Sequence, residues 1–196
     1  EGEFKDGELH GHGKDVVADG NVYEGQWKEG KKHGKGRYAS ADGSSYEGEF
    51  EADLRHGYGK FANADGGSSY EGEYEADLRH GYGKFANADG SSYEGEYQRG
   101  KRHGKGKFTY ASGQVLISSF EAREPVGQGV KWSADRAQAW ELQDGKRGRS
   151  ISQEEAAQIA ARIGLPVPPL EGTYEGESLE GQRHGRGTFV YAHGAT

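Results

Sequence analysis

Histidine is the residue whose repeated spacing in this sequence most suggests chemistry. Six of the eight His residues occupy the same place in a recurring segment: His10, His33, His56, His80, His103 and His184. A row of imidazoles could bind a metal ion or sense pH. However, neighbouring members of the row are expected about 9–10 Å apart, whereas zinc holds imidazole nitrogens at about 2.0–2.1 Å. The spacing therefore favours a structural position at a turn, and we predict no metal site.

Paired carboxylates and a glycine-rich run are two further features that could indicate a catalytic or phosphate-binding site. Glu94 and Glu96 resemble a glycosidase dyad in residue type, but the pair recurs from unit to unit, whereas a catalytic pair is a single constellation in a cleft. The run from His103 to Gly106 lacks the strand–loop–helix context and the Lys-Ser/Thr ending of a phosphate loop. The chain has no Cys, which excludes thiolate chemistry and disulfides. We predict no catalytic residue and no cofactor.

All of these residues belong to one segment that recurs along the chain at nearly constant length. The copy that begins at Tyr93 reads YEGEYQRGKRHGKGKF. Other copies begin at Tyr23, Tyr46, Tyr70 and Tyr174. The starts at 23, 46, 70 and 93 are 23, 24 and 23 residues apart. A fixed period in this range indicates a repeat array. The chain opens inside a unit, and a degenerate unit begins at Leu116, with Phe120 in its aromatic position.

Each unit has the pattern of a β-hairpin. Counting the first aromatic residue as position zero, apolar or Gly residues at even positions alternate with Glu, and a second run alternates Gly with mostly basic residues. Asp-Gly pairs at 42–43, 65–66 and 89–90 separate the units, and we assign them to type I′ turns, which need two positive φ angles. Successive hairpins should pair into one elongated, twisted, antiparallel sheet of about thirteen or fourteen strands.

The two faces of this sheet should differ in chemistry. We expect rings from one strand to lie over the bare glycine backbone of the next, and Glu at positions one and three to pair with Lys or Arg at positions twelve and fourteen on the other face. The rings could instead line a groove that binds an extended peptide or a helix. The candidate groove residues are Tyr23, Trp27, Tyr46, Phe50, Tyr70, Tyr74, Tyr93, Tyr97, Phe120 and Tyr174.

The combination of Tyr-Glu-Gly-Glu-Tyr with Lys-Arg-His-Gly-Lys-Gly resembles the membrane occupation and recognition nexus, or MORN, repeat. The resemblance covers roughly three quarters of the chain. It implies an elongated sheet of hairpins and a non-catalytic role in cytoskeletal assemblies, including the radial-spoke heads of ciliary and flagellar axonemes. It also implies two alternatives, which are a phosphoinositide-binding module at a membrane surface and the targeting region of a larger enzyme such as a kinase or methyltransferase.

Composition restricts the partners. The formal net charge of −7 argues against nucleic acid and against anionic membrane surfaces, which are bound mainly by excess Lys and Arg. Only 32% of residues are hydrophobic, and no long apolar run or signal peptide is visible. Composition therefore leads us to expect a cytoplasmic protein, and the resemblance implies a cytoskeletal location with protein partners. The chain lacks Met and starts in mid-repeat, so we expect flanking sequence.

We divide the chain into a hairpin array at 1–145, with its last unit at 116–145 degenerate, a non-repeat insert at 146–172 and a final hairpin at 173–196. In the insert, Ser152 and Glu155 form a capping box that predicts a helix over 153–163. Its apolar stripe is Ala156, Ile159, Ala160 and Ile163. We expect this stripe to pack on the aromatic face of the sheet, with docking on another chain as the alternative.

Loop leucines at 54 and 78 have two readings. Each could fold back on its own hairpin or contact a partner.

Overall fold

The computed structural model describes residues 1–168, 172–179 and 182–191, with side chains described for residues 1–168. The described residues form sixteen strands and one helix. In chain order these are β1 (Gly2–Lys5), β2 (Glu8–Val16), β3 (Val22–Lys28), β4 (Lys31–Ala39), β5 (Ser45–Glu51), β6 (Leu54–Ala62), β7 (Ser69–Glu75), β8 (Leu78–Ala86), β9 (Ser92–Gln98), β10 (Lys101–Thr109), β11 (Val115–Glu121), β12 (Glu124–Trp132), β13 (Ala139–Gln143), β14 (Lys146–Ile151), α1 (Gln153–Ile163), β15 (Gly172–Leu179) and β16 (Gln182–Tyr191).

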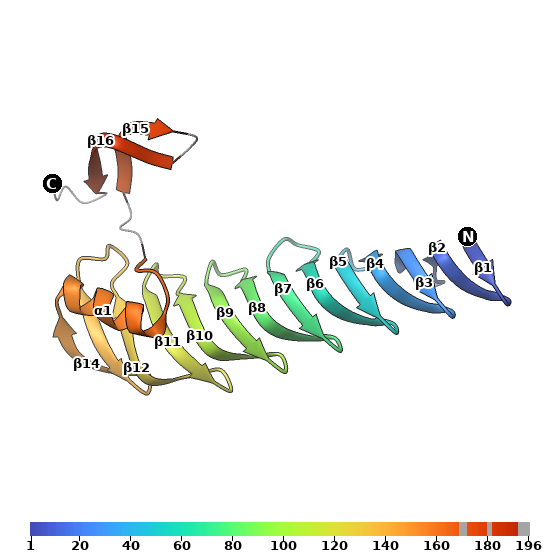
Figure 1. The fold of residues 1–196 in the computed structure, drawn as a ribbon, viewed down its shortest axis with the longest axis horizontal. Helices are drawn as coiled ribbons and strands as arrows, with labels where there is room; N and C mark the ends of the chain where they lie inside the picture. Colours follow the sequence, from blue (N-terminus) through green and yellow to red (C-terminus); the bar gives the residue numbers. More distant parts are fainter. Residues whose placement is uncertain (169–171, 180–181, 192–196) are drawn as a thin grey trace.

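The first fourteen strands form one open antiparallel sheet in which spatial order follows chain order from β1 to β14. Figure 1 shows these strands as a long row of curved hairpins, with β1 at one end and α1 across the other end. β15 and β16 pair with each other in a two-stranded sheet. The elongated all-β array expected from the repeat is therefore confirmed. Each strand contacts its sequence neighbours, so the array needs few distant contacts.

The sheet extends further along the chain than the sequence indicated. We placed the start of the non-repeat insert at 146, but residues Lys146–Ile151 form β14, which pairs with β13 through Ala139–Ile151 and Leu142–Arg147. The strand lacks the Tyr and Gly landmarks of the repeat, so only its pairing partner identifies it. Its other edge has no strand beside it in the described sheet.

The two-residue turns lie at the opposite ends of the hairpins from those assigned from the sequence. The two-residue turns with two positive φ angles lie inside the units, for example at Ala52 (φ 49°) and Asp53 (φ 74°) between β5 and β6. The Asp-Gly pairs lie in longer loops, where only the Gly has positive φ. There the Asp42 side chain accepts a hydrogen bond from the Ser44 N–H at 2.8 Å. Asp therefore shapes these loops through its carboxylate and not through its own backbone angle.

Two glycines of each unit are required for different reasons. Gly57 has φ 55° and lies where the register between β5 and β6 shifts, as expected for a bulge glycine. Gly59 has no positive φ, but a Cβ there would come within 2.3 Å of the Tyr46 hydroxyl oxygen. The ring of one strand thus lies on the bare backbone of the next, as expected from the sequence.

Helix α1 begins and ends as expected but packs on the opposite face of the sheet from the one we expected. Ser152 accepts a hydrogen bond from the Glu155 N–H at 3.1 Å, and Gly164 ends the helix with φ 85°. The buried stripe of α1 contacts β11, β12 and β13 in a cluster with Val115, Ile117, Val130, Trp132, Ala139 and Ile151. The rings belong to a separate cluster.

The reason for this placement is a local change in residue type. Ile117 and Val130 occupy the positions that hold Glu94 and Lys107 in the preceding unit. The charged face therefore becomes apolar over β11 and β12, and burial of the α1 stripe there removes apolar surface from water.

The described residues contain no helix with the length and apolar content needed to cross a bilayer.

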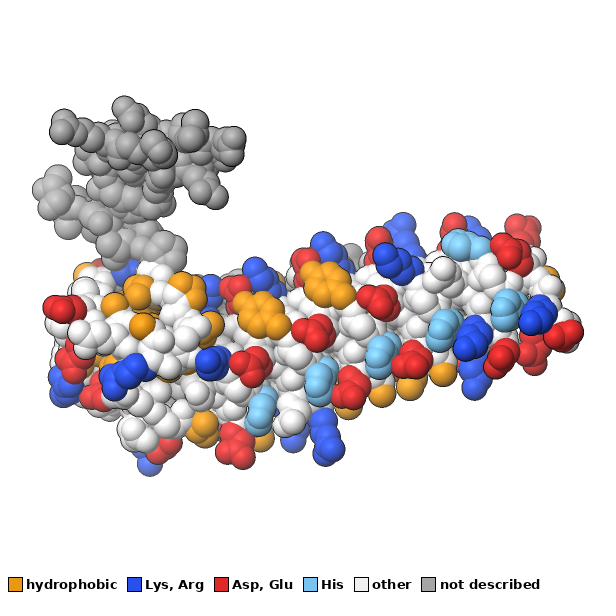
Figure 2. All heavy atoms as spheres, in the orientation of Figure 1, with side chains coloured by type: hydrophobic (Ala, Val, Ile, Leu, Met, Phe, Trp, Pro, Cys, Tyr) orange, Lys and Arg blue, Asp and Glu red, His pale blue; other side chains and the backbone are white. Residues whose placement is uncertain are grey.

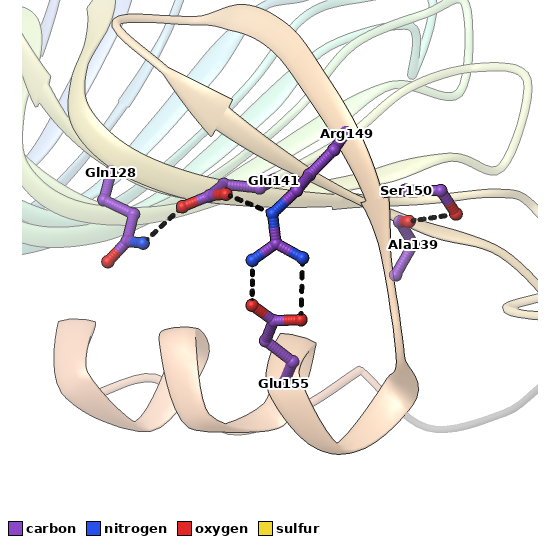
Figure 3. A network of polar contacts seen from close by, with 6 residues as sticks. All are labelled: Gln128, Ala139, Glu141, Arg149, Ser150 and Glu155. Atoms are coloured by element: carbon purple, nitrogen blue, oxygen red, sulfur yellow. Dashed lines mark hydrogen bonds and ion pairs between the residues drawn. The ribbon is translucent and has the colours of Figure 1, made fainter.

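Ion pairs at the rim of this contact join α1 to the sheet (Figure 3). Arg149 of β14 lies between Glu141 of β13 and Glu155 of α1, with its Nε 3.3 Å from Glu141 Oε2 and one terminal nitrogen 3.1 Å from Glu155 Oε2. Gln128 donates to Glu141 at 2.6 Å. Arg149 is 60% exposed, so these contacts orient the helix more than they stabilise it.

Candidate functional site

The rings proposed as a groove lining form the core of the array. Nine of the ten candidate residues are between 1% and 8% exposed: Tyr23, Trp27, Tyr46, Phe50, Tyr70, Tyr74, Tyr93, Tyr97 and Phe120. Tyr174 lies outside the residues whose side chains are described. These nine rings therefore pack on their own sheet and expose little surface. Four of them, Tyr46, Phe50, Tyr93 and Tyr97, nevertheless form part of the lining of two clefts on this face.

The rings contact one another in an edge-to-face series along the sheet. Tyr46 meets Phe50 of its own strand at a centroid distance of 5.1 Å and Tyr74 of the next unit at 5.3 Å, with interplanar angles of 87° and 89°. Equivalent contacts run from Trp27 to Phe120. Edge-to-face pairs at such distances add about 0.5–1.5 kcal/mol each beyond area burial. The series links each unit to the next.

Each leading tyrosine whose side chain is described also donates its hydroxyl proton within its own strand. Tyr46 donates to the Glu49 carbonyl at 3.0 Å, and Tyr70 donates to the Glu73 carbonyl at 2.9 Å. Burial, followed by the negative charge of Asp53, raises the pKa of Tyr23 to about 12. The hydroxyl protons of these phenols are thus donated within the chain, and burial disfavours their ionisation.

Basic side chains form the surface above the rings. Position nine of four successive units is Lys32, Arg55, Arg79 and Arg102, and each lies over aromatic rings. The Arg79 guanidinium carbon is 4.4 Å from the Phe85 centroid, and that of Arg102 is 5.0 Å from the Phe108 centroid. This row was not expected from the sequence, although its residues recur at the same position as regularly as the histidines do.

Two clefts open on this ring-bearing face. One of about 540 Å³ is lined by residues that include Tyr38, Phe61, Arg55 and Asp77. A smaller one of about 220 Å³ lies between Arg79 and Arg102. Tyr and Arg are the residue types that anchor protein interfaces. This face therefore still offers a groove, but its exposed lining is formed by the basic row and by half-buried ring edges.

The opposite face carries alternating charges, as expected, with one difference in pairing. Lys107 and Lys84 lie 2.8 Å and 3.1 Å from Glu94, so position fourteen pairs with position one. Position three does not take part, because Glu73 accepts a hydrogen bond from the Tyr82 N–H at 3.0 Å and lies beside the bulge glycine. A shallow cleft of about 520 Å³ follows the charged row.

Exposed aromatic residues interrupt this charged face, and exposed aliphatic residues lie at the loop tips. Tyr58 and Tyr82 replace Lys at position twelve and are 48% and 44% exposed, with their hydroxyls donating to Glu71 and Glu94. Leu54 and Leu78 at the loop tips are 41% and 48% exposed, so neither is buried against its own hairpin. The loop leucines remain available for contact with a partner.

The histidine row lies along the array without forming a metal site in the described residues. Figure 2 shows His side chains interspersed with acidic and basic ones along the array. His80 Nδ1 lies 2.9 Å from Glu75, and His56 Nδ1 lies 3.3 Å from Glu51. Across the part of the chain with described side chains, no group of three His, Cys, Asp or Glu residues is placed to hold a metal ion. His184 lies outside that part.

Comparison with protein-family models identifies the same repeating unit in this chain. The sequence model of the MORN repeat matches residues 1–22, 23–45, 46–68, 70–92, 93–115 and 174–196. It does not match the degenerate unit at 116–145, although β11 and β12 form the same hairpin there. No curated protein matches.

Among solved structures, the chain is similar to the TCP domain of SAS-4 (dCPAP) from Drosophila melanogaster, determined with a proline-rich motif of Ana2 (dSTIL). The sequence identity is 11% and the TM-score is 0.40, with 72% of this chain and 85% of that chain covered. A likeness at this level says nothing about the partners of the present chain.

Proposed function

We propose that this chain, which belongs to the MORN repeat family, is a non-catalytic scaffold that binds other proteins and holds them at fixed spacing. The observation that carries the proposal is the unbroken order of fourteen strands, in which one series of edge-to-face rings runs from β3 to β11. Each unit is locked to its neighbours, so a partner bound at one unit has a defined distance from a partner bound at another. Equivalent surface positions recur about every 9–10 Å, which is two strand spacings.

The ring-bearing face and the loop tips are the surfaces that would contact partners. The ring-bearing face presents the row of basic side chains over half-buried rings, and the tips present Leu54 and Leu78. Single apolar residues scattered among charged ones are suited to a polar protein interface whose rim remains accessible to solvent. This surface chemistry supports protein partners.

The scaffold is proposed to belong to a ciliary or flagellar axoneme complex such as the radial-spoke head. The support is a resemblance in sequence: the run IGLPVPP at 163–169 interrupts an otherwise regular array and looks like the insert of axonemal members of the family. A cytoplasmic, cytoskeletal location follows from the same resemblance.

The first experiment asks where the chain resides. A tagged copy would be expressed in ciliated cells, the membrane removed with detergent, and the axonemes sedimented. We expect the chain to remain with the axoneme and to crosslink to a small, reproducible set of neighbours. Complete release by detergent would contradict the axonemal role. Flotation of the purified chain with anionic vesicles at physiological salt would instead favour a membrane-surface module.

A second experiment tests spacing directly. The units at 46–69 and 70–92 are nearly identical, so a variant carrying one additional copy of both would lengthen the sheet by four strands, or about 19 Å. We expect each neighbour to bind as before, while crosslinks between neighbours at opposite ends of the array are lost. Unchanged crosslinks in the lengthened variant would show that the array does not set the distance.

A further inference from the structure

Along the basic row on the ring-bearing face, an aspartate accompanies Lys32 and Arg55 but not Arg79 or Arg102, and Arg55 is the member that forms an ion pair among the described residues. Position nine of each unit accepts a backbone hydrogen bond from position seven of the next: Asp53 donates to Lys32, Asp77 to Arg55, Gly100 to Arg79 and Arg123 to Arg102, over 2.8–3.0 Å. These four contacts share one backbone geometry, because position seven has a positive φ of 66–91° in each. The side chain at position seven changes along the series, from Asp in the first two contacts to Gly in the third and Arg in the fourth.

A carboxylate accompanies the first two members of the row. Asp77 Oδ1 lies 3.0 Å from Arg55 Nε and 2.8 Å from the Arg55 N–H, and Asp53 Oδ1 accepts from the Lys32 N–H at 2.9 Å. Gly100 and Arg123 supply no such group. Within the part of the chain that the structure describes, neither Arg79 nor Arg102 has a carboxylate at ion-pair distance.

The unpaired arginines converge on one cleft. The lining of the cleft of about 220 Å³ includes Arg79, Arg102, Arg123 and Gly100, together with the rings of Phe85, Tyr93, Tyr97 and Phe108. The guanidiniums of Arg79 and Arg102 stack on Phe85 and Phe108, which orients them, and each guanidinium has five N–H donors to share among its partners. Arg102 donates one N–H to the Arg123 carbonyl, which further fixes its orientation. A stacked guanidinium of this kind is suited to bidentate binding of a carboxylate.

We propose that this cleft binds an acidic segment of a partner protein, with Glu or Asp carboxylates on Arg79, Arg102 and Arg123. The inference rests on the proposed function only in taking the partner to be a protein. Charge complementarity carries it: three cations meet in one place on a chain whose net charge is −7. The stacked aromatic walls favour a peptide over a bilayer, because a planar anionic membrane would face the net negative chain as a whole.

The chain supplies its own test variants. Gly100→Asp places a carboxylate beside Arg79 on the same backbone geometry that holds Asp77 beside Arg55. Gly30→Asp is the matched control, since Gly30 has φ 70° and the same backbone bond, but its neighbour is Leu9. Asp77→Gly is the reverse change and frees Arg55. All three keep a left-handed position that the array already fills with either Asp or Gly.

The measurement is fluorescence anisotropy of a labelled hexaglutamate peptide with the full chain, beside hexaglutamine and phosphatidylserine vesicles. We expect hexaglutamate alone to bind, Gly100→Asp to weaken its binding about tenfold, and Gly30→Asp to change it by less than about twofold. Asp77→Gly frees Arg55 in the neighbouring cleft of about 540 Å³ and should add a second binding site of the same kind. Equal binding of the two peptides, no binding of either, or equal weakening by both Asp variants would overturn the proposal, and binding to vesicles only would assign the cleft to lipid.

Axoneme retention separates the two proposals. A Gly100→Asp chain that stays with detergent-extracted axonemes and keeps all its crosslinks would refute the acidic-segment site and leave the scaffold intact. Loss of one specific neighbour in Gly100→Asp, but not in Gly30→Asp, would support the site.

Discussion

The packing of each leading tyrosine on a glycine of the next strand can be tested by adding one methyl group. In Gly83→Ala, the new Cβ would come within 2.3 Å of the Tyr70 hydroxyl oxygen and 2.5 Å of its Cζ. Carbon atoms in contact prefer about 3.5–4.0 Å, so the ring must move by about 1 Å. Tyr70 is 1% exposed and lies between Tyr74 and Tyr97 at 5.1 Å and 5.4 Å, which leaves it no room. We expect a loss of about 1–3 kcal/mol in the free energy of unfolding, as for other overpacked cores.

A double-mutant cycle isolates the contact from any general effect of Ala. Tyr70→Leu removes the ring atoms that the added Cβ would meet, so the same Gly83→Ala change should cost about 0.5 kcal/mol or less in that background. Urea unfolding followed by circular dichroism gives the free energies. Hydrogen exchange would show whether protection falls first in β7, β8 and β9, as expected for an array stabilised by neighbouring units. An equal cost in both backgrounds would refute the ring-on-glycine explanation.

Three further changes test other contacts. Ala76 has φ 48° in a two-residue turn, so Ala76→Gly should raise the free energy of unfolding by about 1 kcal/mol in thermal denaturation; no gain would mean that the turn is unstrained. Ile159 of α1 is 1% exposed, so Ile159→Ala should cost about 2–5 kcal/mol and lower hydrogen-exchange protection in α1, whereas Arg149→Met, at an exposed pair, should have a much smaller effect. Burial raises the pKa of Glu94, but hydrogen bonds from Lys107, Tyr82 and Lys84 outweigh it and bring the pKa down from 4.5 to about 2. Because the folded-state pKa is the lower one, this contribution to stability is present above pH 4.5 and is lost as the pH falls through about 2. The difference in melting temperature between the wild type and Glu94→Gln should therefore shrink over that range, and a constant difference would contradict the assignment.

Local sequence was sufficient to predict the array. The alternation of Tyr, Gly and Glu determines which side chains share a face, and the fixed period makes every hairpin pair with its neighbours, so strand order needed no distant information. The helix was equally local, because Ser152 and Gly164 lie at its two ends. The turns were assigned to the wrong ends of the hairpins, because Asp42 acts through its side chain and Ala52 adopts a positive φ that its residue type disfavours.

Tertiary structure alone decided which surfaces remain available. The rings from Tyr23 to Phe120 are buried because each fits between rings of adjacent units, a fact that depends on curvature and register and not on composition. The face covered by α1 depended on Ile117 and Val130, which meet only through the pairing of β11 with β12. Likewise, Arg55 and Asp77 are 22 residues apart and Arg79 faces Gly100, so the contrast between a neutralised and an open arginine exists only once register is known. Periodicity determines how strands pair, whereas the charge and exposure of a site depend on side chains that the pairing brings together.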